Sequence, residues 1–169
     1  MGSLPLETER KFLIAMPEPG LLDALGFSRI SITQTYLLCR GEGVSSRVRR
    51  SVENGLTSYT ATEKKRITDI TRIELERSIT SEEYGRLLAL SDPSLKVIEK
   101  LRRTAKYDGL LLEIDIYPFW SDRAILETEL PDADRPVRLP DYIRVIREVS
   151  SDKRYTNRSL AASVPFESI

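Results

Sequence analysis

Charged and apolar residues alternate along much of this chain. The clearest example lies near its start, where Glu7, Glu9 and Lys11 occupy every second position. Successive side chains of a β-strand point to opposite faces, so this period of two predicts a strand with the three charged residues in one row. The opposite face of that strand would carry Leu6, Thr8, Arg10 and Phe12. The same alternation returns in later segments, so we expect a protein built mainly from β-strands.

Turn signals mark where these strands end. The dipeptides Asn54-Gly55 and Asp108-Gly109 are typical of two-residue turns between antiparallel strands. A further turn is expected at 41–43, and a proline-rich loop at 131–140, followed by a short helix or strand through residue 148. The strands that we expect between these signals are 6–12, 31–38, 46–50, 58–66, 72–79, 96–105, 110–117 and 124–130.

Three short helices are expected beside the strands. Thr80, followed three residues later by Glu83, forms a capping box and predicts a helix from about Ser81 to Leu90. A shorter helix over 21–25 would end at Gly26, since glycine readily adopts the conformation that closes a helix. The last helix is expected near the end of the chain, beginning at about residue 157.

Like charges are paired on strand after strand. Acidic residues two positions apart are Glu7/Glu9, Glu74/Glu76, Glu113/Asp115 and Glu127/Glu129. Basic residues with the same spacing are Arg47/Arg49, Lys64/Arg66 and Lys100/Arg102. For any one strand, the simplest interpretation is the solvated face of an open antiparallel sheet. For the whole set this interpretation fits poorly, because neighbouring like charges repel each other unless something offsets them.

We therefore favour a barrel whose interior, called the lumen below, is lined by these charged residues. Helices would then cover the apolar outer faces of the strands. Charges in a narrow lumen are partly desolvated, so they persist only if they are paired or bound to metal. Metal ions would neutralise the acids, and a polyanionic ligand would neutralise the bases.

Composition narrows the chemistry further. The chain has no histidine and one cysteine, Cys39, which excludes zinc sites with histidine or thiolate ligands, a Ser-His-Asp triad and an internal disulfide. Any bound metal would have oxygen ligands, as magnesium, manganese and calcium prefer. A single cysteine also suits a reducing compartment, so we expect a cytoplasmic protein.

Size and charge indicate a single globular domain over residues 1–169. Basic and acidic residues number 26 each, so no global positive charge suggests binding to nucleic acid or to an acidic membrane surface. No apolar run approaches the ~20 residues of a membrane-spanning helix. Nucleic acid and membrane are therefore not expected as partners, and the oligomeric state is left open between monomer and homodimer.

Carboxylates, bases and a polyanion together indicate metal-assisted phosphoryl or nucleotidyl transfer. A divalent ion held by carboxylates can bridge phosphate oxygens and polarise the phosphorus. Arginine and lysine can hold the remaining oxygens and stabilise charge on the leaving phosphate. A second ion, or a side chain such as Lys11 or Tyr36, would orient or deprotonate the attacking water.

The sequence resembles the CYTH superfamily of triphosphate tunnel metalloenzymes over nearly its whole length. The resemblance opens with the signature Glu7-x-Glu9-x-Lys11. It continues through Gln34-Thr35-Tyr36-Leu37, Arg47-Val48-Arg49, Thr62-Glu63-Lys64, Arg72-x-Glu74-x-Glu76, Lys100-x-Arg102, Glu113-Ile114-Asp115 and Glu127-Thr128-Glu129-Leu130-Pro131. It closes with Asp152-Lys153-Arg154-Tyr155-Thr156-Asn157, which is similar to the segment before the family's C-terminal plug helix.

The resemblance implies an α+β, mainly β fold, an eight-stranded antiparallel tunnel, and hydrolysis of a triphosphate with Mg²⁺ or Mn²⁺. The metal ligands implied first are Glu7, Glu9, Glu127 and Glu129, with Glu74, Glu76, Glu113 and Asp115 as second candidates. The phosphate-binding residues implied are Lys11, Arg47, Arg49, Lys64, Arg72, Lys100 and Arg102. Tyr36 matches a tyrosine proposed as proton acceptor, although a phenol with a pKa near ~10 is a poor base. Arg154 is implied as a further substrate-binding residue, which would close one end of the tunnel.

One motif departs from the family pattern. Relatives commonly have an apolar residue before the lysine of Thr62-Glu63-Lys64, and here a second lysine, Lys65, follows it. We expect Lys64 to face the lumen because it keeps phase with Arg66. A slip of one residue would exchange the two faces and place Lys65 there instead.

Four functions remain open from the sequence. The leading one is hydrolysis of inorganic tripolyphosphate to diphosphate and phosphate. A class IV adenylyl cyclase would need an adenine-reading motif, which we do not find. Cyclases of this family also commonly carry a histidine just before the signature, and this chain has no histidine. A thiamine triphosphatase could stack its substrate on Trp120, although a lone tryptophan in a loop is more often a packing residue. The non-enzymatic alternative is a module that binds polyphosphate or a nucleotide.

Overall fold

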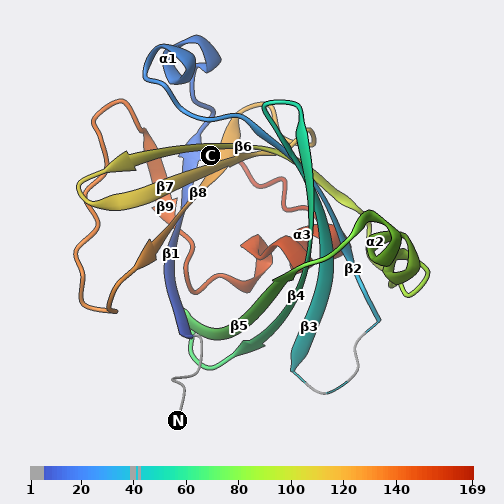
Figure 1. Ribbon diagram of the computed structural model, residues 1–169. Helices are drawn as coiled ribbons and strands as arrows, with labels where there is room; N and C mark the ends of the chain where they lie inside the picture. Colours follow the sequence, from blue (N-terminus) through green and yellow to red (C-terminus); the bar gives the residue numbers. More distant parts are fainter. Residues whose placement is uncertain (1–5, 39–40, 42) are drawn as a thin grey trace.

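The computed structural model describes residues 6–38, 41 and 43–169 (Figure 1). Its strands are β1 (Leu6–Ala15), β2 (Ile30–Tyr36), β3 (Val44–Glu53), β4 (Leu56–Arg66), β5 (Thr71–Ser78), β6 (Ile98–Tyr107), β7 (Leu110–Ile116), β8 (Arg123–Leu130) and β9 (Val145–Glu148). Its helices are α1 (Pro19–Ala24), α2 (Ser81–Leu88), the 3-10 turn η1 (Lys153–Tyr155) and α3 (Asn157–Ala162).

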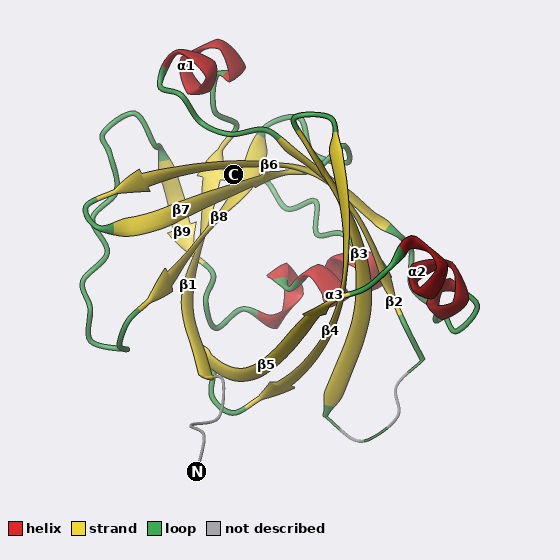
Figure 2. Ribbon diagram, viewed as in Figure 1, coloured by secondary structure: helices red, strands yellow, loops and turns green. Residues whose placement is uncertain are grey.

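Strands β1 to β8 close into an antiparallel barrel. Their hydrogen-bonded order is β5-β4-β3-β2-β6-β7-β8-β1, and β1 also pairs with β5 to complete the ring (Figure 2). The closing pair is short and runs from Leu6↔Ile73 to Thr8↔Thr71. Farther along β1, three of the four residues of β9 pair with it between Phe12 and Ile14, and the register shifts between Leu13 and Ile14. The closed eight-stranded antiparallel barrel expected from the sequence is confirmed, and β9 is an extra strand outside the ring.

The predicted turns have the backbone geometry that they require. Asn54 and Gly55 both have positive φ, of 49° and 78°, and Asp108 and Gly109 have 48° and 75°. Two successive positive φ values are characteristic of the type I′ turn, which matches the twist of the strands that it joins. The turn expected at 41–43 includes residue 42, which lies outside the described residues.

One half of the predicted capping box is observed at α2, and the Glu83 carboxylate, which would form the other half, binds Arg77. Thr80 Oγ accepts a hydrogen bond of 3.1 Å from the backbone N–H of Glu83, so one otherwise unpaired N–H of the first turn has a partner. The helix ends at Leu88, two residues before the predicted end at Leu90. Helix α2 lies outside the barrel against β3 and β4, and α1 also lies outside (Figure 1).

Apolar residues form two clusters on opposite sides of the barrel wall. The outer cluster includes Phe12, Ile14 and Leu126, and it is covered by Leu22 of α1 and by Ile143, which precedes β9. The inner cluster lies within the lumen. It brings together the lumen-facing Leu13, Ile98, Ile125 and Tyr117 with Tyr155 of η1 and Leu160 and Ala161 of α3.

Helix α3 therefore fills one end of the lumen, in contrast to the two helices outside (Figure 1). Its buried residues, Leu160 and Ala161, are apolar, and the lumen-facing positions of β1, β6 and β8 change from charged to apolar at this end. Burying these apolar surfaces against each other removes both from water. The barrel is thus divided into a closed apolar end and a charged end.

Candidate active site

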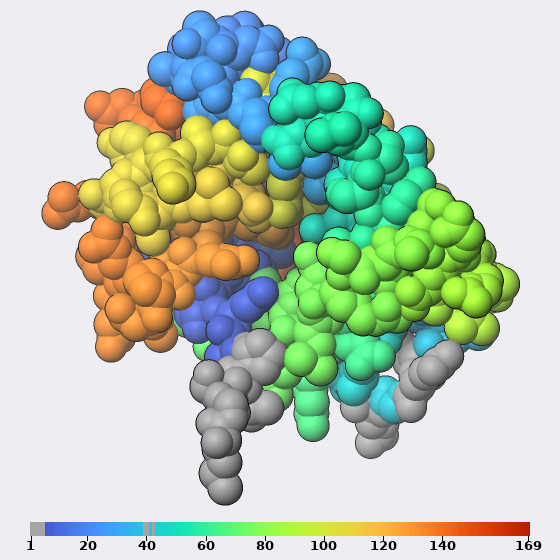
Figure 3. All heavy atoms as spheres, in the orientation of Figure 1, coloured from blue at the N-terminus to red at the C-terminus, as the bar shows by residue number. Residues whose placement is uncertain are grey.

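The charged end of the lumen forms a cavity of about 470 Å³, within the range of roughly 300–1,000 Å³ typical of small-molecule sites. In Figure 3 the surface is hollowed between β1, in blue, and the green strands. The lining includes most of the residues singled out in the sequence: Glu7, Glu9, Lys11, Tyr36, Arg47, Arg49, Lys64, Arg72, Glu74, Glu76, Arg102, Glu113, Glu127 and Glu129.

Strand register brings these side chains together. Glu9 lies opposite Glu129 and Lys11 opposite Glu127 on β1 and β8. Residues directly opposite each other in an antiparallel pair project to the same face, so each such pair points into the same lumen. The same holds for Lys64 opposite Glu74 on β4 and β5, and for Arg102 opposite Asp115 on β6 and β7. The expectation that alternate charged residues face one enclosed space is thereby met.

Within the cavity the acids and bases bind each other. Lys11 Nζ lies 2.7 Å from Glu127 Oε1 and 3.8 Å from Glu9 Oε1. Arg72 donates to Glu9 through Nη1 at 2.6 Å and to Glu74 through Nε at 3.2 Å. Because the opposite charges compensate one another, the lumen can be lined by ionised groups despite their burial.

Glu74 is held by bases from three strands. Arg47 of β3, Lys64 of β4 and Arg72 of β5 all form ion pairs with its carboxylate. Burial alone would raise the pKa of Glu74, but Lys64 and Arg47 outweigh that effect and lower it to about 2. Burial, with the positive charges of Arg47 and Arg72, lowers the pKa of Lys64 to about 8. Several bases therefore share few carboxylates in this part of the cavity.

Carboxylates are crowded at the β1–β5 junction. Burial raises the pKa of Glu7 to about 7, and the negative charges of Glu74 and Glu129 add to that effect. Its nearest base, Arg72, is 3.7 Å away and is shared with Glu9 and Glu74. An additional cation would relieve the repulsion among these acids.

Asp115, Lys100 and Arg102 form the most deeply buried charged group of the lumen. The Lys100 and Asp115 side chains are fully buried, with Lys100 Nζ 2.5 Å from Asp115 Oδ2. Arg102 donates to both oxygens of Asp115, from Nε at 2.7 Å and from Nη2 at 2.8 Å. Arg102 also reaches Glu113 and Glu127, so it links this layer to the cavity above. Lys100 and Asp115 are not among the cavity-lining residues, whereas Arg102 is.

No group of three or more acidic or cysteine side chains in the described part of the chain is arranged to hold a metal ion as it stands. The physical reason is visible in the ion pairs, since Glu9, Glu74 and Glu127 are each bound to a lysine or arginine. The donor set itself is suited to magnesium or manganese, because it consists of carboxylate oxygens from adjacent strands.

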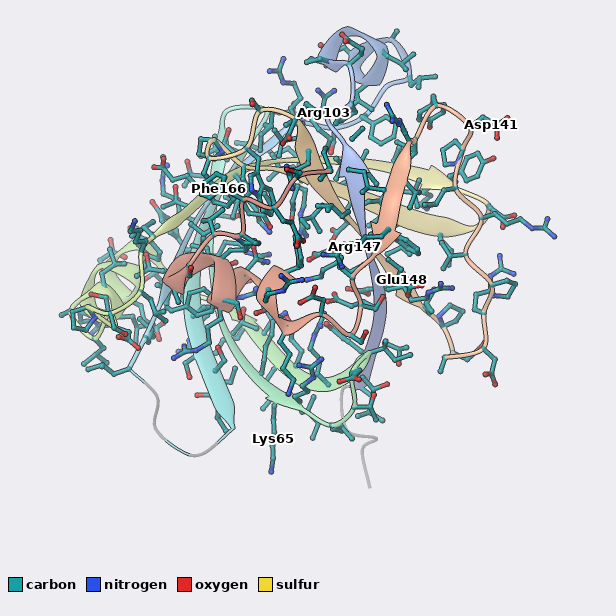
Figure 4. The ribbon with its side chains drawn as sticks, turned by 180° about the vertical axis from the view of Figure 1, so that it is seen from behind. Lys65, Arg103, Asp141, Arg147, Glu148 and Phe166 are labelled. Atoms are coloured by element: carbon teal, nitrogen blue, oxygen red, sulfur yellow. The ribbon has the colours of Figure 1, made fainter. Side chains whose placement is uncertain are left out.

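The sequence-based selection of Lys64 over Lys65 agrees with the geometry. Lys64 lines the cavity, and Figure 4 shows Lys65 projecting away from the barrel. Arg154, in contrast, is not brought to the cavity. Its exposed guanidinium binds Asp152 and Glu167 and lies 5.8 Å from the centre of the Tyr155 ring.

Trp120 belongs to the apolar end and not to the cavity. Its ring is buried against Tyr117 and Tyr155, and its indole N–H donates to the Pro165 carbonyl at 3.1 Å. The interpretation of this tryptophan as a packing residue agrees with these contacts.

Sequence reasoning missed several polar residues of the cavity, among them Asn157 and Arg158, which begin α3. Arg158 lies 5.6 Å from the centre of the Tyr36 ring and 3.6 Å from Asp92. The sequence feature that could have identified Arg158 is its position four residues, about one helical turn, after Arg154. Arg66, Ser150 and Asp152 also line the cavity.

Comparisons with known proteins agree with this geometry. No protein-family model matches the chain. The chain is 31% identical over 163 residues to an inorganic triphosphatase of Nitrosomonas europaea, covering 94% of this chain and 99% of that protein. A crystal structure of the inorganic triphosphatase NE1496 superposes with a TM-score of 0.60 at 28% identity, over 94% of this chain and 96% of that one.

A more distant structure, the PH1819 protein of Pyrococcus horikoshii, shares the fold with a TM-score of 0.58 at 22% identity, over 76% of this chain and 80% of that one. Coverage of nearly the full length by the bacterial relative includes the acidic and basic strands that form the cavity. The chain therefore belongs to the inorganic triphosphatase family of CYTH-type triphosphate tunnel proteins.

Proposed function

We propose that this protein hydrolyses inorganic tripolyphosphate to diphosphate and phosphate, with Mg²⁺ or Mn²⁺ as cofactor. The observation that supports this most is the pairing of many bases with many carboxylates in one cavity of about 470 Å³. A triphosphate and a divalent ion would together supply what both sets of side chains need. The relatedness to an inorganic triphosphatase points to the same substrate.

The bases would hold the phosphate oxygens. Lys11, Arg47, Arg49, Lys64, Arg72 and Arg102 all line the cavity and are available for this role, with Lys100 buried behind them. Arginine can bind two phosphate oxygens at once through its fixed fork of N–H donors. Phosphate oxygens would replace carboxylates as partners of these side chains, which frees the carboxylates.

The freed carboxylates would hold the metal ion. We place Glu7, Glu9, Glu127 and Glu129 first, since β1 and β8 set them opposite or next to one another. Glu74, Glu76, Glu113 and the buried Asp115 are the second candidates. Glu74, Glu113 and Asp115 bind arginine side chains, whereas Glu76 accepts a hydrogen bond from the Thr62 hydroxyl. When bound, a divalent ion neutralises phosphate charge and polarises the phosphorus.

In the reaction, a water oxygen would attack the terminal phosphorus, and the bond from that phosphorus to the bridging oxygen would break. Diphosphate leaves with the electron pair of the broken bond, and the proton of the attacking water is lost to the surroundings. Lys11 and the cavity arginines stabilise the charge that develops on the leaving group. Lys11 is 8% exposed and its Nζ lies 2.7 Å from Glu127, so its charge acts in a medium of lower polarity than water.

The other candidate functions have less support. Thiamine triphosphate would lose the stacking partner suggested for it, because Trp120 is packed in the apolar end. A class IV adenylyl cyclase would need a base-binding pocket, and the cavity lining is dominated by charged residues suited to phosphate. A non-catalytic polyphosphate-binding module would bind the same ligand without releasing phosphate.

The binding partners and the cellular compartment of the protein are also proposals. The substrate is a small polyphosphate, nucleic acid and membrane are not expected as partners, and the protein would be a monomer or a homodimer. In the described part of the chain, no helix is long and apolar enough to cross a bilayer. The single cysteine is the reason for expecting the cytoplasm.

Phosphate release from tripolyphosphate, ATP and thiamine triphosphate, each with magnesium, manganese or EDTA, tests the function. Tripolyphosphate should be the best substrate, and EDTA should stop the reaction. Glu9→Gln should abolish turnover while circular dichroism stays unchanged. Glu99→Gln is the matched control, since it changes an exposed glutamate of β6 outside the cavity and should remain active. Full activity in Glu9→Gln, or activity that survives EDTA, would overturn the mechanism.

A further inference from the structure

Gln34 is fully buried in the wall of the cavity and uses both ends of its side-chain amide. Its Oε1 accepts a hydrogen bond of 3.3 Å from Arg49 Nη2, and its Nε2 donates one of 2.8 Å to Tyr36 Oη. Arginine has only donors, so the amide oxygen must face Arg49. The amide nitrogen must therefore face Tyr36, and the orientation of Gln34 is fixed by its partners.

This orientation limits the directions in which the Tyr36 hydroxyl can donate a hydrogen bond. The phenolic oxygen accepts from Gln34, so its O–H bond has to point elsewhere. The charged groups that act on this hydroxyl are Arg47, Lys11 and Arg49, and Arg158 lies over the ring. All four are cations without an acceptor atom. Among the described residues, Tyr36 Oη has no acceptor for its proton.

Tyr36 itself lines the cavity, where a phosphate would supply the missing acceptor. Burial raises the pKa of Tyr36 above its ordinary value, which keeps the phenol in its neutral, proton-bearing form. A neutral phenol that receives a hydrogen bond and is surrounded by cations is a donor and not a base.

We propose that Gln34 is a positioning residue that turns the Tyr36 hydroxyl into a hydrogen-bond donor to a phosphate oxygen of the bound substrate. This inference rests on the proposed function and specifies the role of one residue in it. It assigns to Tyr36 the stabilisation of negative charge in place of deprotonation of water. Gln34 would not touch the reacting atoms, and it would act through Tyr36.

Two substitutions at position 34 separate positioning from packing. Gln34→Leu removes the donor to Tyr36. Gln34→Glu keeps the size of the side chain and its contact with Arg49, and the positive charge of Arg49 favours the ionised carboxylate. That carboxylate would accept a hydrogen bond from the Tyr36 hydroxyl and so turn its O–H bond away from the cavity. We expect kcat for tripolyphosphate with magnesium to fall about 10-fold in Gln34→Leu and at least as much in Gln34→Glu, with little change in KM. If Gln34 served packing alone, Gln34→Glu would be the milder change.

A double-mutant cycle tests whether Gln34 acts through Tyr36. Tyr36→Phe should lower kcat about 100-fold, as expected for the loss of one donor to a developing charge. In the Tyr36→Phe background, Gln34→Leu should change kcat by less than about twofold, because the group that it positions is gone. Thr35→Val, on the same strand with its side chain on the other face, is the control and should keep wild-type kcat. A full 10-fold effect of Gln34→Leu in the Tyr36→Phe background overturns the inference.

The two proposals fail in different ways. Wild-type protein that releases no phosphate contradicts the proposed function, whereas active wild-type protein with equally active Gln34 variants contradicts only the role of Gln34. If the variants do not fold, as judged by thermal unfolding, a crystal structure with bound tripolyphosphate decides the question. It should show Tyr36 Oη within about 3.2 Å of a phosphate oxygen. Tyr36 Oη without such a neighbour refutes the proposal.

Discussion

Lys100 and Asp115 form an ion pair with both side chains fully buried, Nζ lying 2.5 Å from Oδ2. They come from neighbouring strands, β6 and β7, and Arg102 binds the same carboxylate through two nitrogens. Burial lowers the pKa of Lys100 to about 7, although Asp115 favours the charged form. The pair thus lies beneath the cavity and fixes Arg102, which reaches into it.

We predict that Asp115→Asn destabilises the protein more than Lys100→Met. Asp115 serves two cations, so its loss leaves Lys100 and part of Arg102 uncompensated, whereas loss of Lys100 leaves Asp115 bound by Arg102. Removing one member of a buried pair typically costs about 3–5 kcal/mol. We expect Lys100→Met near the lower value and Asp115→Asn at or above the upper one. Urea denaturation measures both.

The control for this pair is Arg77, whose exposed side chain binds Glu83. Arg77→Met should leave the free energy of unfolding unchanged within error, because exposed ion pairs are screened by water and salt. If Lys100→Met were as harmless as Arg77→Met, the buried pair would not stabilise the fold.

A second prediction concerns α3 at the apolar end of the lumen. Leu160 is 2% exposed and packs into the inner cluster, so Leu160→Ala should lower the free energy of unfolding by about 2–5 kcal/mol. It should also weaken tripolyphosphate binding, since Asn157 and Arg158 of the same helix line the cavity. Leu25→Ala, at a side chain 46% exposed beside α1, is the control and should cost less than about 0.5 kcal/mol. Equal losses in both variants would show that α3 is not anchored by Leu160.

Much of the barrel wall was predictable because local pattern determines it. The phase of Glu7, Glu9 and Lys11 follows from the period of a strand alone, and Asn54-Gly55 specifies its own turn. Closure of the barrel depends instead on pairing between strands that are distant in sequence. The pairing of Leu6 with Ile73 joins strands far apart in sequence, and it follows from the tilt of all eight strands, which no local pattern contains.

The part of the site contributed by α3 was the least predictable. Arg154 and Arg158 are four residues apart and equally plausible from sequence. Which one reaches the cavity depends on the irregular turn η1, where Asp152 binds Arg154 and holds its side chain outside. The orientation of Gln34 could likewise not be predicted from the sequence, because it depends on Arg49 from the neighbouring strand.

A third prediction compares two glycines. Gly55 has φ of +78° in the β3–β4 turn, a conformation that strains any residue with a Cβ. Gly55→Ala should therefore destabilise the protein by about 1 kcal/mol or more. Gly85 lies inside α2 with open space around it, so Gly85→Ala should stabilise by about 0.5–1 kcal/mol through better helix propensity. Thermal unfolding of the two variants should shift in opposite directions, and shifts of the same sign would contradict the argument.

The last prediction concerns acid and the segment before α3. Arg154, together with the Arg154 backbone N–H and Arg147, lowers the pKa of Asp152 to about 2 from an ordinary value near 3.8. A carboxylate with a depressed pKa in the folded state contributes stability above its unfolded pKa and loses it as pH falls through the folded pKa. The contribution of Asp152 should thus be complete above about pH 4 and disappear toward pH 2. Because its arginine partners are largely exposed, we expect it to be below about 1 kcal/mol.

Thermal unfolding of the wild type and of Asp152→Asn across this pH range measures the effect as a difference. The wild type should unfold at a higher temperature at pH 6, and the two curves should converge as the pH approaches 2. Added salt should reduce the difference at pH 6, since exposed charges are screened. Other carboxylates titrate in both proteins alike, so they cancel in the comparison. A difference that stays constant from pH 6 to pH 2 would show that Asp152 stabilises the turn through its neutral hydrogen bonds and not through its charge.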